Sequence, residues 1–203
     1  MNTHRDDPSN DLIRTETIAE RSRLADLLTG LDHDQWSTPS LCEGWQVREV
    51  VAHLTMAYRY NVPRLLLGLA RSGFRFNAYA DRAAQADTSA LSDTELLESL
   101  SNNIGTPWTP PGGGVVGALS HDIIHGLDIT EPLGLPPSPP ERIRLVLNNV
   151  TRKTLAYFGV ELTGRRLVAE DVDLELGTGT HEMRMSAREM LMAMTGRVPL
   201  PDL

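Results

Sequence analysis

Apolar residues recur at helical spacing along most of the chain. Between residues 11 and 31, Ile13, Leu24, Leu28 and Leu31 fall near one face of a helix, and charged residues lie elsewhere in the segment. Residues three or four apart lie on the same side of a helix, so this spacing predicts an amphipathic helix. Further helices are predicted over residues 46–57, 76–86, 92–100, 115–129 and 141–158. The chain is therefore expected to be mainly α-helical.

Breaking residues separate these helices. Pro63 should kink or end the second helix, because proline cannot donate a backbone hydrogen bond inside a helix. The stretch PPGGG at 110–114 frees the chain before the helix at 115–129, and EPLGLPPSPP at 131–140 is expected to stop that helix and form an extended linker.

The period changes from helical to two near the end of the chain. Residues 171–176 alternate between polar and apolar types, GTGT follows, and Met183 and Met185 alternate again, which predicts a β-hairpin. Ser186 opens a capping box and Gly196 should end a last helix. We therefore expect an antiparallel helical bundle over residues 1–160 and a small ββα appendage over residues 161–203. An isolated hairpin is marginal in water, so it should pack on the bundle or on a partner chain.

Composition narrows the function classes. The 203 residues carry a net charge of −8 without a basic stripe, which argues against a nucleic-acid partner. There is a single cysteine, Cys42, and the first ten residues lack the apolar core of a signal peptide. No apolar run approaches the ~20 residues that span a bilayer. These features predict a cytoplasmic protein without a membrane partner.

The stretch SHDIIHGLDI, residues 120–129, carries the candidate chemistry. His121 and His125 are four residues apart, so they lie one turn apart on the same helix face and could chelate one ion. Asp128 continues this face, whereas Asp122 is expected to face solvent. The pair alone is a weak signal, because two histidines at this spacing also arise by chance.

A third ligand could come from His53, which lies on the inward side of the predicted second helix. Three neutral imidazoles suit a borderline divalent ion such as Zn²⁺ and leave an open coordination position, as catalytic sites do. The alternative is that His53 is a core histidine satisfied by hydrogen bonds, and that His121 and His125 face solvent or cap a helix.

Three motifs resemble those of the mycothiol-dependent maleylpyruvate isomerase family, within the DinB-like superfamily of four-helix metal proteins. The first is DQWSTPSLCEGWQVREVVAHL at 34–54, with its Trp, Pro-Ser and Gly-Trp-x-Val-x-x-Val-x-x-His pattern ending at His53. The second is HDIIHGLDITEPLG at 121–134. The third consists of RRLVAEDVDLELGTG at 165–179 and MLMAMTGR at 190–197, which resemble the short C-terminal domain of these proteins.

The resemblance implies a DinB-like four-helix bundle that holds a divalent metal through His53, His121 and His125. The isomerase itself has a glutamate where this chain has His121, and three-histidine sites are typical of other DinB-like proteins. A neutral ligand in place of an anionic one leaves the site one charge more positive, which should lower the pKa of a bound thiol or water. Metal binding is therefore expected, but the exact activity does not transfer.

The resemblance also implies a low-molecular-weight thiol cosubstrate, mycothiol or a relative, and a small electrophilic substrate. The expected reaction is S-transfer or isomerisation by a metal-bound thiolate, without an identified protein base. Asp128 could orient an imidazole by accepting its hydrogen bond, and Trp45, Cys42 and Arg82 are candidates for the pocket. Two alternatives stay open, which are a hydrolase with a metal-activated water and a non-catalytic metal or small-molecule binding protein. The chain could be a monomer or a homodimer.

Overall fold

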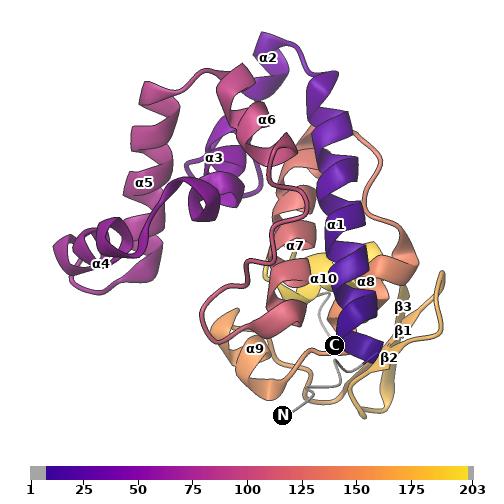
Figure 1. The fold of residues 1–203 in the computed structure, drawn as a ribbon. Coiled ribbons are helices and arrows are strands. Elements are labelled where there is room, and N and C mark those ends of the chain that lie inside the picture. The colour runs from indigo at the N-terminus through magenta and orange to yellow at the C-terminus, as the bar shows by residue number, and fades with distance from the viewer. Residues whose placement is uncertain (1–7, 201–203) are drawn as a thin grey trace, which may run out of the picture.

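Four helices form the bundle in the computed structural model, which describes residues 8–200 (Figure 1). They are α1 (Pro8–Thr29), α3 (Val47–Arg59), α6 (Asp93–Ser101) and α7 (Gly114–Leu133). Each packs against two others, so that the contacts α1–α7, α7–α3, α3–α6 and α6–α1 close a ring. The expected mainly α-helical fold is confirmed. The outermost residues of both expected domains, 1–7 and 201–203, lie outside the described range, and the boundary at residue 160 stays a prediction.

The bundle helices do not all alternate in direction, as a strictly antiparallel bundle would require. Arg21 of α1 pairs with Asp122 of α7, and one turn later Leu24 contacts Gly126, so α1 and α7 are parallel. In contrast, the backbone of Leu41 bonds to Asp128 while His53 meets His121, so α3 runs opposite to α7. The long excursion between α3 and α6 permits this arrangement.

Helix α3 lies at the centre of the fold. It packs against α5 (Phe76–Ala90), α6 and α7, and every residue from Val47 to Met56 except Arg48 is buried. Such a helix must place any polar side chain against a partner, because an unsatisfied buried polar group is costly. His53 is one of these buried residues, so the packing of α3 brings it into the bundle interior.

Two shorter helices flank the bundle. Helix α2 (His33–Trp36) lies in the loop after α1, and α4 (Val62–Arg71) begins with Pro63 in its first turn. Helix α3 ends at Arg59, so the predicted break at Pro63 is confirmed. Figure 1 shows α4 and α5 projecting to one side of the bundle, whereas the strands lie on the other side.

Two helix boundaries differ from prediction. Helix α7 continues through Pro132 to Leu133, and Gly134 then ends it with a left-handed φ of 62°. The predicted helix at 141–158 is instead α8 (Pro140–Leu147) and α9 (Arg152–Tyr157). The break occurs because Thr151 leaves the helical conformation and its side chain accepts a hydrogen bond from the Thr154 backbone, as N-cap residues do.

The C-terminal segment holds three strands, and the predicted hairpin is wrong. Strand β1 (Arg165–Ala169) lies between β2 (Glu175–Leu176) and β3 (His181–Met185), so the two expected strands do not pair with each other. The β1–β2 pair is antiparallel and the β1–β3 pair is parallel. The appendage is therefore βββα.

The strands and the last helix, α10 (Ala187–Met194), pack on the bundle. Helix α10 contacts α7, α8 and β1, and one apolar cluster includes Leu119, Ile143, Leu167 and Met190, each fully buried. The chain's last helix is thereby fixed beside α7. Within the described residues, no helix combines the length and apolarity needed to cross a membrane.

Candidate metal centre

Three histidines from α3 and α7 converge. His53 is 8% exposed, and its Nε2 atom lies 3.4 Å from Nε2 of His121. His125 lies one turn further along α7, and one ring nitrogen from each of the three residues falls within 4.8 Å of the others. The structure therefore brings together the three residues that the sequence motifs singled out.

Carboxylates orient the two imidazoles on α7. Nδ1 of His121 is 3.0 Å from Oδ1 of Asp122, and Nδ1 of His125 is 2.9 Å from Oδ2 of Asp128. Because an ionised carboxylate only accepts hydrogen bonds, each neutral imidazole carries its proton on Nδ1. The lone pair then resides on Nε2, the nitrogen that is left to bind a metal.

The carboxylate of Asp122 is buried, so the expectation that it faces solvent is wrong. Nε of Arg21 donates to Oδ2 of Asp122 at 2.7 Å, and Nη1 of Arg21 donates to the carbonyl oxygens of Ile104 and Thr106. Sequence periodicity could not reveal this position, because the partner lies on α1, 101 residues earlier. His121 is thus held by a buried chain of side chains that reaches α1.

Asp128 is fully buried and does not lie at the surface. Arg197, just after α10, donates two hydrogen bonds to Asp128, from Nε to Oδ1 at 3.0 Å and from Nη2 to Oδ2 at 2.9 Å. Burial alone would raise the pKa of Asp128, but the hydrogen bonds from His125 and Arg197 outweigh it and hold that pKa far below its usual range. Asp128 therefore stays ionised and can accept the proton-bearing Nδ1 of His125.

The protonation states fit a metal site. Burial, and then the neighbouring imidazoles His125 and His121, hold the pKa of His53 well below its ordinary value. Burial also lowers the pKa of His125, although its hydrogen bond to Asp128 opposes this. These two imidazoles are therefore neutral at physiological pH, the form that ligates metals. Histidine nitrogens are among the donors that Zn²⁺ prefers.

A second group of potential ligands, Cys42, His125 and Asp128, also lies within 4.8 Å. This group fits a metal poorly, because Arg197 already occupies both oxygens of Asp128. The Cys42 thiol donates to Asp128 at 3.0 Å, and burial, followed by the charge of Asp128, raises its pKa to about 12. Cys42 is therefore a protonated hydrogen-bond donor that helps to hold Asp128.

A cavity of about 880 Å³ opens onto the three histidines. Its walls include Cys42 and Trp45, which were expected there, and Phe158 and Arg197, which were not. Arg82 is not part of this cavity. It donates from α5 to Ser72 and to the Arg71 carbonyl, and it lines a different hollow.

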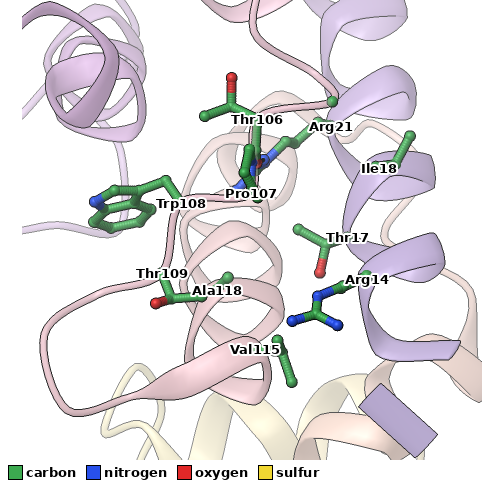
Figure 2. Close-up of a pocket in the computed structure, with 11 residues that line it drawn as sticks. Arg14, Thr17, Ile18, Arg21, Thr106, Pro107, Trp108, Thr109, Val115 and Ala118 are labelled. Atoms are coloured by element: carbon green, nitrogen blue, oxygen red, sulfur yellow. Dashed lines mark hydrogen bonds between the residues drawn. The ribbon is translucent and has the colours of Figure 1, made fainter. Parts of the chain in front are cut away.

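A second cavity lies between α1 and α7, bounded on one side by the segment at 105–109 (Figure 2). Its volume is only about 80 Å³, and Figure 2 shows Thr17 and Arg14 directed into the gap between the two helices. Trp108 lines it, and the Trp108 ring lies 5.5 Å from that of His121. This space has room for a few waters at most, so the larger cavity is the candidate substrate site.

Sequence reasoning missed Arg197, although the C-terminal motif that resembles the family ends at this residue. The fold and the site together define a mainly helical protein whose bundle carries three convergent histidines beneath a cavity.

Comparison with known proteins agrees with this class. Residues 18–105 match the family model of the mycothiol maleylpyruvate isomerase N-terminal domain, which confirms the resemblance found in the sequence. The match includes His53 and ends before His121. No curated protein matches the chain.

Two solved structures have the same fold. One is the crystal structure of the mycothiol-dependent maleylpyruvate isomerase, with a TM-score of 0.61, and the other is a histidine-to-alanine mutant of that enzyme, with a TM-score of 0.62. Each is 18% identical in sequence, and the similarity covers 98% of this chain and 93% of the other. The likeness therefore extends beyond the bundle to the C-terminal strands and helix.

Proposed function

We propose that this protein is a divalent-metal-dependent enzyme that uses a mycothiol-like thiol for S-transfer to, or isomerisation of, a small electrophile. The observation that carries the proposal is the convergence of His53, His121 and His125 beneath a cavity of about 880 Å³. The family match over residues 18–105 and the shared fold support the choice of a mycothiol-like thiol and of this class of reaction.

The three Nε2 atoms would hold the ion, and Zn²⁺ is the expected metal. When bound, such an ion supplies a Lewis acid that keeps a thiol in its thiolate form at neutral pH. The chain's own residues fix the ligands. Asp122 and Asp128 set the tautomers of His121 and His125, while Arg21 and Arg197 donate hydrogen bonds that hold the two carboxylates in place.

The cavity would accommodate the thiol with its sulfur beside the imidazoles, and the electrophile against the remaining walls. S-transfer ends with the sulfur bonded to the electrophile, whereas isomerisation requires the sulfur to leave again after rotation about a carbon–carbon bond. Cys42 is not a competing nucleophile, because its raised pKa keeps it protonated. The C-terminal segment takes part by supplying Arg197 and by closing one side of the cavity.

The first test is metal content, measured by mass spectrometry on protein purified without a polyhistidine tag. About one equivalent is expected in the wild type, and none in the His121→Ala/His125→Ala variant. His33→Ala is a matched control, because the His33 side chain is 81% exposed and does not line the cavity. A folded wild-type protein that takes up no metal after supplementation would refute the proposal.

The second test separates the enzyme classes. The loaded protein is mixed with mycothiol and an electrophile, and product is followed with and without the thiol. Thiol-dependent product supports the proposal. Hydrolysis of an ester at the same rate without thiol would replace it with a metal-activated-water hydrolase, and stoichiometric metal with neither activity would replace it with a binding protein.

A further inference from the structure

The large cavity offers little positive charge for an anionic substrate. Apart from the three histidines, the charged side chains among its described lining residues are Glu43 and Arg197. Glu43 would repel an anion. The thiolate that the proposed ion would hold offsets part of that ion's charge, so among the described side chains of the wall only Arg197 could pair with a carboxylate of the electrophile.

Arg197 is already engaged. Its Nε and Nη2 atoms donate to the two oxygens of Asp128, and its Nη1 atom donates to the Thr195 carbonyl at 2.9 Å. Only 15% of its side chain is exposed, and Asp128 is fully buried. Turning Arg197 toward a substrate would leave the Asp128 carboxylate buried without its cation, which is strongly unfavourable. Arg197 therefore stays on Asp128, and because the two opposite charges balance, the pair offers no net positive charge to the cavity.

Four aromatic side chains from three segments form part of the cavity wall. They are Trp45 before α3, Phe76 at the start of α5, and Tyr157 and Phe158 at the end of α9. The Trp45 ring is fixed because its Nε1 donates a hydrogen bond to Asp81 at 2.9 Å. The Tyr157 and Phe158 rings pack edge to face, with their centroids 4.9 Å apart. Leu41, Pro110 and Ile124 add further apolar surface. Flat apolar groups gain most from such walls.

We infer that the electrophile is an uncharged molecule with an aromatic or similarly flat apolar body, and not a dicarboxylate such as maleylpyruvate. The inference rests on the proposed function and narrows its substrate. It also separates this chain from the activity named for the two similar structures, although the fold is shared.

A matched pair of probes tests the inference, 4-chloro-3-nitrobenzoate and its methyl ester, which differ in the charge at one end. In S-transfer to either probe the thiol sulfur bonds to the ring carbon, chloride leaves with the electron pair, and the thiol proton is released. With mycothiol and loaded enzyme, the rate relative to the uncatalysed reaction should be at least tenfold higher for the ester. Equal or greater enhancement for the benzoate, or faster turnover of maleylpyruvate than of the ester, would overturn the inference.

A binding measurement keeps this inference separate from the proposed function. Methyl 3-nitrobenzoate and 3-nitrobenzoate, which lack the leaving group, are titrated into the protein as purified while tryptophan fluorescence is followed. Tighter binding of the ester by tenfold or more supports the inference even if no turnover is found, which would count only against the proposed function. Tighter binding of the benzoate would contradict it.

Two variants locate the effect. Phe76 is 48% exposed at the cavity, so Phe76→Arg adds a cation that water can still solvate. It should strengthen benzoate binding about tenfold and weaken ester binding. Phe74→Arg is the control, because Phe74 is 77% exposed and does not line the cavity. Equal effects from both variants would show that the added charge acts at long range and that Phe76 does not contact the probe.

Discussion

Removing Arg197 should destabilise the protein more than removing any surface arginine. Arg197→Met keeps most of the apolar volume of the side chain but leaves Asp128, which is fully buried, without its two charge-assisted hydrogen bonds. Breaking a buried ion pair by removing one partner costs about 3–5 kcal/mol. For a chain of this size such a loss lowers Tm by roughly 6–20 °C.

The assay is urea unfolding followed by circular dichroism, with thermal melts alongside. Arg188→Met is the matched control, because Arg188 also joins the C-terminal segment to α7, through Glu131, but its side chain is 37% exposed. An ion pair with that exposure contributes about 0–1 kcal/mol. The two variants therefore compare a buried pair with a solvated one at the same junction.

A double variant and a pH series sharpen the test. Arg197→Met/Asp128→Asn removes the stranded charge and should recover at least about 1 kcal/mol of the loss. The native pKa of Asp128 is lowered, so the pair contributes its full stability at pH values above the unfolded pKa of about 4. This contribution is lost progressively as pH falls from there toward the lowered native pKa. The difference between wild type and Arg197→Met should therefore shrink below about pH 4. A loss under 1 kcal/mol at pH 7 would refute this account of the pair.

Three other outcomes are expected. Cys42 should react with iodoacetamide at pH 8 about a thousandfold more slowly in the native protein than in urea. The reason is that a pKa of about 12 in place of 9.0 reduces the thiolate fraction by that factor. Equal rates, measured by mass spectrometry, would contradict the raised pKa. Asp122→Asn should weaken Zn²⁺ binding about 10–100-fold in a chelator competition, since it removes the carboxylate acceptor that orients His121. Unchanged affinity would rule out this role. Gly179→Ala should cost about 1–3 kcal/mol in urea unfolding, because the new Cβ would lie 1.9 Å from the Gly164 backbone. Gly105→Ala, which meets nothing within 4 Å, should cost less, and equal costs would argue against this steric conflict.

The helices, and the helix face on which each histidine lies, could be predicted because they depend on local geometry. The four-residue spacing of His121 and His125 fixes their shared helix face, and the apolar neighbours of His53 place it inward. Residue spacing could not predict that α3 and α7 pack together, because His53 and His121 are 68 residues apart in the chain. The family motifs supplied that pairing.

The errors arose where distant partners decide the outcome. Asp122 looks like a surface residue until Arg21 is placed beside it, and Asp128 gains its cation from Arg197, 69 residues later. Strand β1 gives no hairpin signal, because its five-residue pairing with β3 is parallel and therefore lacks a tight turn. The alternation at 171–176 lies mostly in a bend, and only Glu175 and Leu176 are in a strand.

The hydrogen bonds from Arg197 to Asp128 also affect the order in which parts of the protein form during synthesis. A ribosome makes the four bundle helices well before residue 197, and domains generally fold from their N-terminal parts as they emerge. Until then, the nascent bundle carries Asp128 without its arginine, and His125 lacks a firmly held acceptor. We therefore expect the helices to assemble first and the histidine site to mature last, once the C-terminal segment docks against α7.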